Sequence, residues 1–188
     1  MPTITLHRPS LEELSFRQEF LADPATMAYN HAYGGTIDFP RERWADWYAR
    51  WVETDSGERF YRYLYDPQAD AFVGEAAYHL DGELNGYICD VIVTAACRGR
   101  GYGSQGLTLL CEAARANGVD RLYDNIAIDN PSVSLFLRSG FREVSRNEDY
   151  ILVAKDLYNE ADRRSILWKK KWQHIGKNCG GIMRTRAS

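Results

Sequence analysis

Residues 98–104 read Arg98-Gly99-Arg100-Gly101-Tyr102-Gly103-Ser104, and this glycine-rich stretch decides the fold prediction. An apolar run over 87–93 precedes it, and an apolar stripe at helical spacing follows it, formed by Leu107, Leu110, Cys111 and Ala114. The pattern predicts a strand, a glycine loop and a helix in that order. The first turn of a helix presents backbone N–H groups without internal partners, and the helix dipole adds partial positive charge there. Because glycines let an anion approach this backbone closely, we expect a phosphate-bearing ligand at the loop.

The composition is that of a globular protein. Of 188 residues, 45% are apolar and 26% are charged, and the net charge is −3. This length supports one compact domain with a core, and the charge gives no general attraction to nucleic acid. The N-terminus lacks the pattern of a signal peptide, and no run of about 18 apolar residues occurs, so no membrane partner is expected. The four cysteines (Cys89, Cys97, Cys111 and Cys179) show no C-x-x-C spacing, which fits a reduced, cytoplasmic setting without a metal.

The remaining patterns predict strands and helices in alternation. A helix opens at Pro9-Ser10, a loop with Asp23-Pro24 and Gly34-Gly35 covers 23–40, and a second helix carries an aromatic face of Trp44, Trp47, Tyr48 and Trp51. Further elements follow in this order: strands at 60–65, 71–80 and 86–93, a helix at 102–117, a strand at 122–128, a short helix opened by Asn130-Pro131, and one or two strands over 142–154.

Two segments in this order carry a family resemblance. Arg98, Gly101 and Gly103 match the pattern [Gln/Arg]-x-x-Gly-x-[Gly/Ala], and residues 130–141, from Asn130-Pro131 to Gly140-Phe141, match a second hallmark segment of the same family. Over about residues 3–156 the chain therefore resembles the GNAT superfamily of acetyl-CoA-dependent N-acetyltransferases. The resemblance implies a mixed α/β fold, with a central twisted sheet of about six to seven strands and helices on both faces. Acetyl-CoA would lie in a gap where strands four and five splay apart.

The resemblance also implies a domain division and a set of donor-binding residues. Residues 1–157 would form the catalytic domain, and 158–188 a basic extension, with a helix followed by a mobile tail. Backbone groups of Val91, Ile92 and Val93 would hold the acetyl carbonyl and the pantetheine amides. Asn130 would reach the pantetheine or the adenosine side, and the pyrophosphate would be held by Arg98, Gly99, Arg100, Gly101, Tyr102, Gly103 and Ser104.

A dinucleotide site is the alternative interpretation of the same loop. Residues 101–106 form a literal G-x-G-x-x-G, and Asp120, Asp124 and Asp129 follow at roughly the distance of a ribose-binding acid. However, too few strands and helices remain downstream to complete a doubly wound sheet.

Several ionisable side chains are candidates for the acid–base chemistry. An attacking amine must be neutral, and free amines with a pKa of about 10 are mostly charged at neutral pH. Asp90 lies in an otherwise apolar strand beside the expected acetyl group, and some family members use an acid there as the base, directly or through water; the alternative is a hydrogen-bonded structural Asp. Glu75 and His79 on the preceding strand are further candidates. The alternative interpretations are that Glu75 faces solvent and that His79 has a structural role.

The family's usual general acid is a tyrosine, but here that position holds Phe136, which cannot donate a proton. Either another group, for which Tyr150 is the candidate, protonates the leaving thiolate, or the thiolate leaves unprotonated, as its pKa of about 8.5 permits.

Aromatic and polar residues mark the expected acceptor site. They are Tyr29, Asn30, His31 and Tyr33, with the strand face of Tyr61, Tyr63 and Tyr65; the alternative is that they cover the edge of the core. The leading hypothesis is transfer of acetyl from acetyl-CoA to a primary amine of a small molecule. A protein or peptide acceptor, and a catalytically silent acyl-CoA-binding module, are the alternatives. A homodimer is common among look-alikes.

Overall fold

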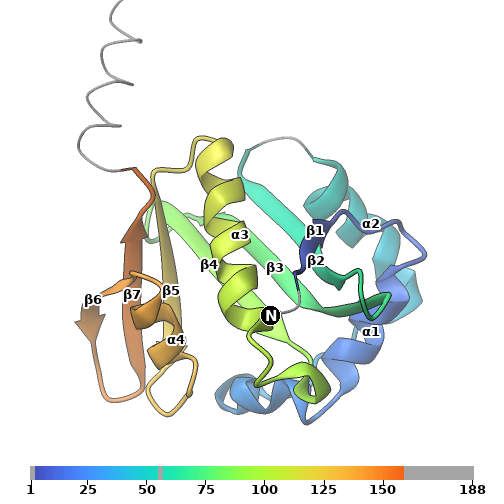
Figure 1. Cartoon of the computed structure of the whole chain (residues 1–188), viewed down its shortest axis with the longest axis horizontal. Coiled ribbons are helices and arrows are strands. Elements are labelled where there is room, and N and C mark those ends of the chain that lie inside the picture. The colour runs from blue at the N-terminus through green and yellow to red at the C-terminus, as the bar shows by residue number, and fades with distance from the viewer. Residues whose placement is uncertain (1–2, 55–56, 159–188) are drawn as a thin grey trace, which may run out of the picture. The chain divides into compact units, whose positions relative to one another are not determined.

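A seven-stranded mixed sheet forms the centre of the computed structural model, which describes residues 3–54 and 57–158 (Figure 1). The strands lie in the order β1-β2-β3-β4-β5-β7-β6, and every neighbouring pair is antiparallel except β4 and β5. Their bounds are β1 (Thr5–His7), β2 (Arg59–Asp66), β3 (Ala71–Asp81), β4 (Gly86–Val93), β5 (Arg121–Ala127), β6 (Arg142–Arg146) and β7 (Tyr150–Asp156). The predicted mixed sheet is confirmed. The helix and tail expected beyond residue 158 lie outside the described residues.

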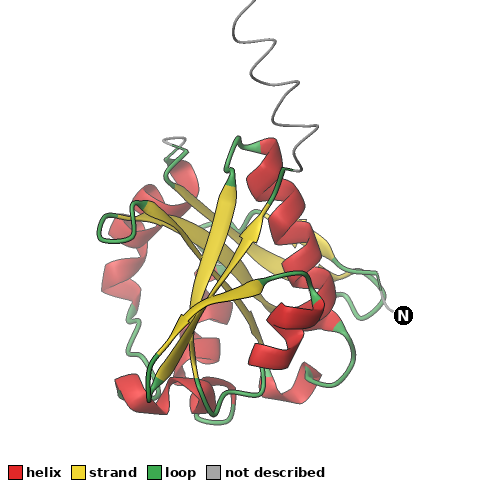
Figure 2. Cartoon of the chain, turned by 90° about the vertical axis from the view of Figure 1, so that its left-hand side faces the viewer, coloured by secondary structure: helices red, strands yellow, loops and turns green. Residues whose placement is uncertain are grey.

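Helices cover both faces of this sheet (Figure 2). On one face α3 (Tyr102–Ala116) packs against β3 and β4, and α4 (Val133–Arg138) lies beside α3, β6 and β7. The other face is covered by α1 (Leu14–Ala22), α2 (Trp44–Tyr48) and the π-helical η3 (Ala49–Glu53). Short 3-10 helices complete the set: η1 (Thr26–Tyr33), η2 (Arg41–Arg43) and η4 (Ala95–Cys97).

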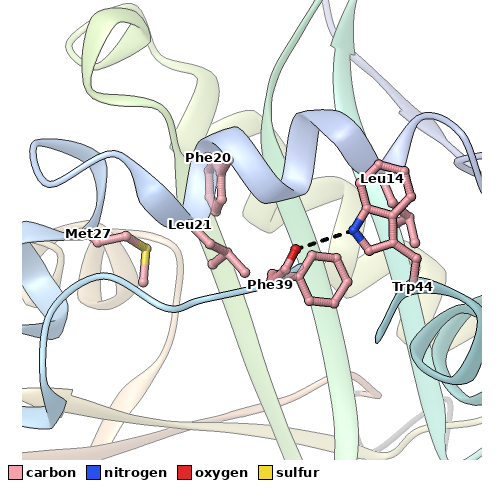
Figure 3. Packing of buried hydrophobic residues seen from close by; sticks show 6 residues of the cluster. All are labelled: Leu14, Phe20, Leu21, Met27, Phe39 and Trp44. Atoms are coloured by element: carbon pink, nitrogen blue, oxygen red, sulfur yellow. Dashed lines mark hydrogen bonds between the residues drawn. The ribbon is translucent and has the colours of Figure 1, made fainter. Parts of the chain in front are cut away.

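The N-terminal layer has a core of its own. Figure 3 shows six buried side chains from α1, η1, the segment before α2 and the start of α2: Leu14, Phe20, Leu21, Met27, Phe39 and Trp44. The Trp44 indole N–H donates to the Phe39 carbonyl at 3.3 Å, so the buried ring also satisfies its polar atom. The sequence predicted only a loop over 23–40, but residues 26–33 form η1. The Asp23 carboxylate starts it by accepting the N–H groups of Ala25 and Thr26.

The predicted strand–loop–helix unit is present as β4, η4, a glycine loop and α3. Gly101 immediately precedes α3 with φ of +86°, a left-handed conformation that side chains with a Cβ adopt only at a cost. At Gly106 close packing explains the glycine instead, since a Cβ there would lie 2.8 Å from Leu64 Cδ1. These glycines bring the first turn of α3 close to the end of β4.

The sheet opens between β4 and β5. These parallel strands pair only at Tyr87 with Leu122 and at Ile88 with Tyr123. Beyond Ile88 the strands diverge, and Figure 1 shows β5, β7 and β6 parting from the rest of the sheet near α3. The predicted splay between strands four and five is therefore present. A dinucleotide fold needs a run of parallel strands, so the largely antiparallel order contradicts that alternative.

Candidate active site

A cavity of about 930 Å³ opens where β4 and β5 separate. Its lining comes from β4, the glycine loop, the first turn of α3, β5, the segment leading into α4, and η1. Most of the sequence-predicted site residues line it: Asp90, Val91, Ile92, Val93, Arg98, Gly99, Gly101, Tyr102, Gly103, Ser104, Asn130, Tyr29, Asn30 and His31. Arg100, Glu75 and Tyr150 lie outside the lining, and the side chain of Tyr33 lies outside the described part of the chain.

The first turn of α3 offers backbone donors to the cavity. The first helical hydrogen bond of α3 runs from the Gln105 N–H to the Gly101 carbonyl at 3.2 Å, and no side chain caps the helix. The N–H groups of Tyr102, Gly103 and Ser104 therefore precede the helical ladder. Three such donors at the positive end of a 15-residue helix suit a pyrophosphate, so this end of the cavity fits the donor predicted from the sequence.

The exposed edge of β4 offers a second row of backbone groups. Because β5 pairs with β4 only as far as Ile88, residues 91–93 have no strand partner on the cavity side. On their other side they are paired with β3, where Gly74 lies opposite Val93. Backbone amides on such an edge form hydrogen bonds with an incoming chain of amides, as in strand addition. The edge therefore suits the two amides of a pantetheine arm.

The Arg98 side chain connects two walls of the cavity. Its guanidinium donates to the carbonyls of Val93 at 3.3 Å, Ala25 at 3.1 Å and Thr26 at 2.6 Å. The Thr26 hydroxyl in turn accepts the Ala95 N–H at 2.9 Å. These contacts tie η1 to the end of β4. The Arg98 side chain therefore holds the neighbouring backbone, while the backbone of the loop faces the cavity.

Asp90 lies on β4 two residues beyond the last pairing with β5, and its side chain faces the cavity. Burial raises the pKa of its carboxyl group, His79 and Arg17 oppose that shift, and the charge of Glu75 adds to it. A carboxylate whose pKa is raised is a stronger base toward an ammonium group than an ordinary aspartate.

Asp124 on β5 is a cavity residue that the sequence suggested only as a ribose-binding acid. It follows Tyr123, the last β5 residue paired with β4. Burial raises the pKa of Asp124 well above its usual range, and the charge of Asp90 raises it further. By the register of β4 and β5, the Asp90 side chain shares a sheet face with Ile88 and Tyr123, and that of Asp124 lies on the other face. The signal in the sequence is a carboxylate between Leu122 and Ile126, which are both buried on the same strand.

Glu75 lies in a buried network outside the cavity lining. Only 5% of the residue is exposed, so the interpretation as a solvent-facing strand glutamate is wrong. Its carboxylate accepts from the Arg17 guanidinium and from the Tyr61 hydroxyl. Burial alone would lower the pKa of Arg17, but the oxygens of Glu75 and Tyr61 outweigh it and raise that pKa. His79, on the same strand face, packs edge-on against Trp51 at 5.6 Å.

Phe136 lies in the cavity lining, is only 2% exposed and packs edge-on against Phe141 at 4.9 Å. Its ring therefore serves the core and supplies no proton. Tyr150, at the start of β7 opposite Ala127, lies outside the cavity lining.

The helix η1 forms the wall opposite the donor end. Tyr29, Asn30 and His31 line the cavity, and the Asn30 amide holds the helix end by donating to the Gly35 carbonyl at 2.8 Å. The exposed His31 side chain lies 3.6 Å from the carboxylate of Asp129 on the far wall. Of the second predicted acceptor group, Tyr61 and Tyr63 are buried in the core beneath α1 and α2, away from the lining.

Residues 3–54 and 57–158 contain no cluster of three or more His, Cys, Asp or Glu side chains arranged to hold a metal ion. Within the same ranges, no helix is long and apolar enough to cross a bilayer.

A family profile identifies the family of this chain, and solved structures share its fold. The profile of the Acetyltransferase (GNAT) family matches residues 17–141, more than half of the chain. A GNAT-family acetyltransferase from Bacillus anthracis shares the fold with a TM-score of 0.66 at 14% identity, covering 82% of this chain and 95% of its own. No curated protein sequence gives a significant match.

Two other solved structures carry ligands. Spermidine N-acetyltransferase from Vibrio cholerae, in complex with CoA and spermine, has a TM-score of 0.66 at 16% identity, covering 82% of this chain and 96% of its own. A putative acetyltransferase from Salmonella typhimurium, with its cofactor acetyl-CoA, has a TM-score of 0.63 at 20% identity, covering 84% and 95%. These structures show the same fold, and the matching profile shows that the chain belongs to the GNAT acetyltransferase family and is an acetyl-CoA-dependent acyltransferase.

Proposed function

We propose that the protein transfers acetyl from acetyl-CoA to a primary amine of a small molecule, with Asp90 as the base, directly or through a water. The observation that carries this proposal is the position of Asp90 in the cavity. It lies between the β4 edge that suits the donor and the η1 wall that would face the acceptor. A base must stand within reach of both reacting groups, and the place of Asp90 in the same cavity lining as Tyr29 supports this role.

The residues that would hold acetyl-CoA are already assembled. The N–H groups of Tyr102, Gly103 and Ser104 suit the pyrophosphate, and the free edge of residues 91–93 suits the pantetheine arm. When bound, acetyl-CoA supplies an activated acetyl thioester. Gly103 lets α3 pack closely against Leu135 of α4, since a Cβ there would lie 3.2 Å from Leu135 Cδ2.

The carboxylates of the cavity suit a cationic acceptor. An amine enters mostly as an ammonium ion, which negative charge attracts, and it must then lose a proton before attack. The raised pKa of Asp90 brings its basicity closer to that of the amine. Backbone N–H groups on the free edge of β4 are the donors available to stabilise charge on the acetyl oxygen.

The shape of the acceptor wall supports a small molecule. Hydrogen bonds from the Arg98 guanidinium hold η1 near the end of β4. The His31 and Asp129 side chains approach each other from opposite walls. We expect an acceptor to bind between Tyr29 and the β4–β5 opening. The spermidine N-acetyltransferase with the same fold is named for a small polyamine, which is consistent with this acceptor class.

The experiment is a screen of small primary amines and short peptides that follows CoA release. The proposal predicts turnover with at least one class of small amine. Asp90→Asn should then lower kcat/KM by about 100-fold or more, the effect of removing a general base. Asp120→Asn, an exposed acid outside the cavity, is the matched control. Turnover of peptides alone would contradict the small-molecule acceptor, and a near-normal rate for Asp90→Asn would eliminate the base.

A further inference from the structure

Asp66, at the end of β2, is a buried acid that the proposed mechanism does not use. Only 2% of the residue is exposed, and it lies outside the cavity lining. Its Oδ1 accepts the N–H groups of Gln68 at 2.8 Å and Ala69 at 3.3 Å. Its Oδ2 accepts the hydroxyl of Tyr102, the first residue of α3, at 2.5 Å. Burying a carboxylate is costly unless donors satisfy it, so these contacts fix its position.

The face of β2 that carries Asp66 packs against α3. Side chains alternate along a strand, so Leu64 and Asp66 point to the same face. A Cβ at Gly106 would lie 2.8 Å from Leu64 Cδ1, and Asp66 bonds Tyr102 on the same helix. Residues 102 and 106 are four apart, so they lie one above the other on α3. Two contacts in a row therefore hold the first turns of α3 against β2.

The same end of the β2–β3 pair also holds the end of β4. The register of β2 and β3 shifts after Leu64, so Val73 has no partner in the register with β2. Bulges of this kind are common next to active sites, where they redirect the chain. The Val73 carbonyl accepts the Thr94 N–H at 3.0 Å, just beyond the end of β4. One strand pair therefore contacts both ends of the connection from β4 to α3, which contains the glycine loop.

We propose that Asp66 is a positioning residue for acetyl-CoA: it holds the Tyr102 hydroxyl and thereby keeps the first turn of α3 where its N–H groups bind the pyrophosphate. This inference rests on the proposed place of the pyrophosphate at α3, and it depends neither on the acceptor nor on Asp90. Asp66 acts through Tyr102, whose backbone N–H is one of the three donors that precede the helical ladder.

The charge on Asp66 strengthens its hydrogen bond with Tyr102. The Tyr102 hydroxyl lowers the pKa of Asp66, and the Gln68 and Ala69 N–H groups add to that effect against the opposing effect of burial. Asp66 is therefore a carboxylate at neutral pH. In turn, this carboxylate raises the pKa of the Tyr102 hydroxyl, which stays protonated and donates. A hydrogen bond to an ionised acceptor is roughly twice as strong as a neutral one.

The first test compares two ligands by calorimetry on the full chain. CoA carries the pyrophosphate, whereas pantetheine carries only the arm that suits the edge of β4. We expect Tyr102→Phe, which keeps the backbone N–H, to raise the Kd of CoA by about tenfold, the low end for a hydrogen bond to a charged group. The Kd of pantetheine should stay at its wild-type value, because a positioning role concerns the pyrophosphate alone.

Tyr78→Phe is the matched control. Tyr78 is also buried, and its hydroxyl accepts from the Asn117 amide at 2.7 Å, at the opposite end of α3. Tyr78→Phe should leave both Kd values unchanged. An unchanged Kd of CoA in Tyr102→Phe, an equal rise for both ligands, or an equal rise in the control would overturn the inference alone. A wild type that binds CoA no more tightly than pantetheine would overturn the place of the pyrophosphate, and the inference with it.

The second test asks whether Asp66 acts through Tyr102. In Asp66→Ser the hydroxyl can still accept the Gln68 N–H, but no second oxygen remains for Tyr102. We expect Asp66→Ser to raise the Kd of CoA in the wild-type background and to leave it unchanged in Tyr102→Phe, because the effects of two residues in one hydrogen bond do not add. An equal change in both backgrounds would show that Asp66 acts by another route, and the proposal would be wrong.

Discussion

Removing the charge of Glu75 tests whether the buried network beneath α1 is structural. The Arg17 side chain is 15% exposed and that of Glu75 is 6% exposed, so both charges are largely removed from water. The guanidinium lies 4.5 Å from the Trp47 ring centroid and 5.1 Å from that of Tyr61. In Glu75→Gln the guanidinium would stay in this apolar enclosure without its counter-charge.

The expected cost is large compared with the stability of a typical domain. Breaking a buried ion pair by removing one partner costs about 3–5 kcal/mol, out of a total of about 5–15 kcal/mol for a native domain. With a urea dependence of about 2 kcal/mol per molar, the unfolding midpoint should fall by about 1.5–2.5 M. The double variant Arg17→Met with Glu75→Leu removes both charges and should recover most of that loss.

Urea unfolding followed by tryptophan fluorescence measures these midpoints. Glu19→Gln is the matched control, because Glu19 is an exposed acid on the same helix as Arg17 and its variant should unfold at the wild-type midpoint. A Glu75→Gln midpoint within about 0.3 M of the wild type would refute the structural assignment, since the expected shift is several times larger. If stability is kept while acetylation is lost, Glu75 is a catalytic residue after all.

Three further variants probe the walls of the cavity. Arg98→Met should raise the KM for the amine by about tenfold, because the carbonyls of η1 lose their hydrogen bonds to the guanidinium. A tenfold change corresponds to about 1.4 kcal/mol. If only the Kd of acetyl-CoA rises, Arg98 binds the pyrophosphate instead. Gly101→Ala should weaken acetyl-CoA binding and lower the free energy of unfolding by about 1–2 kcal/mol, because φ is +86° at this position. Gly82 has no positive φ, so Gly82→Ala is the control and should change neither quantity. Calorimetry measures the binding and urea unfolding measures the stability. Asp124→Asn should raise the melting temperature at neutral pH. The pKa of Asp124 is raised in the folded protein, so this carboxyl group makes the fold less stable as the pH rises above its unfolded pKa of about 3.9. Below about pH 3, where both states are protonated, that gain should vanish, and a gain independent of pH would contradict the charge repulsion.

Local patterns were enough to predict the elements that line one end of the cavity. The apolar run before residue 98 and the helical stripe after 104 depend on neighbours in sequence, so they predicted β4, the glycine loop and α3 closely. The short helix after Asn130-Pro131 was predicted for the same reason. Asp90 was found because a carboxylate interrupts an apolar strand.

Long-range contacts explain what the sequence did not predict. Glu75 is buried beside Arg17, which is 58 residues away in the chain. The Arg98 guanidinium donates hydrogen bonds to carbonyls that are 72 and 73 residues away. The place of Asp124 in the cavity lining depends on how β5 diverges from β4, and the pattern of its own strand does not reveal that divergence. Such contacts follow from the sheet order, which local periodicity leaves open.

The location of acetyl-CoA is the central claim, and amide hydrogen exchange tests it most directly. The account predicts that acetyl-CoA slows exchange at the N–H groups of Tyr102, Gly103 and Ser104 and along residues 91–93, because these groups gain hydrogen bonds to the ligand. The helix α2, on the far face of the sheet, should exchange at its original rate. Protection absent from the first turn of α3, with acetyl-CoA bound, would contradict the account.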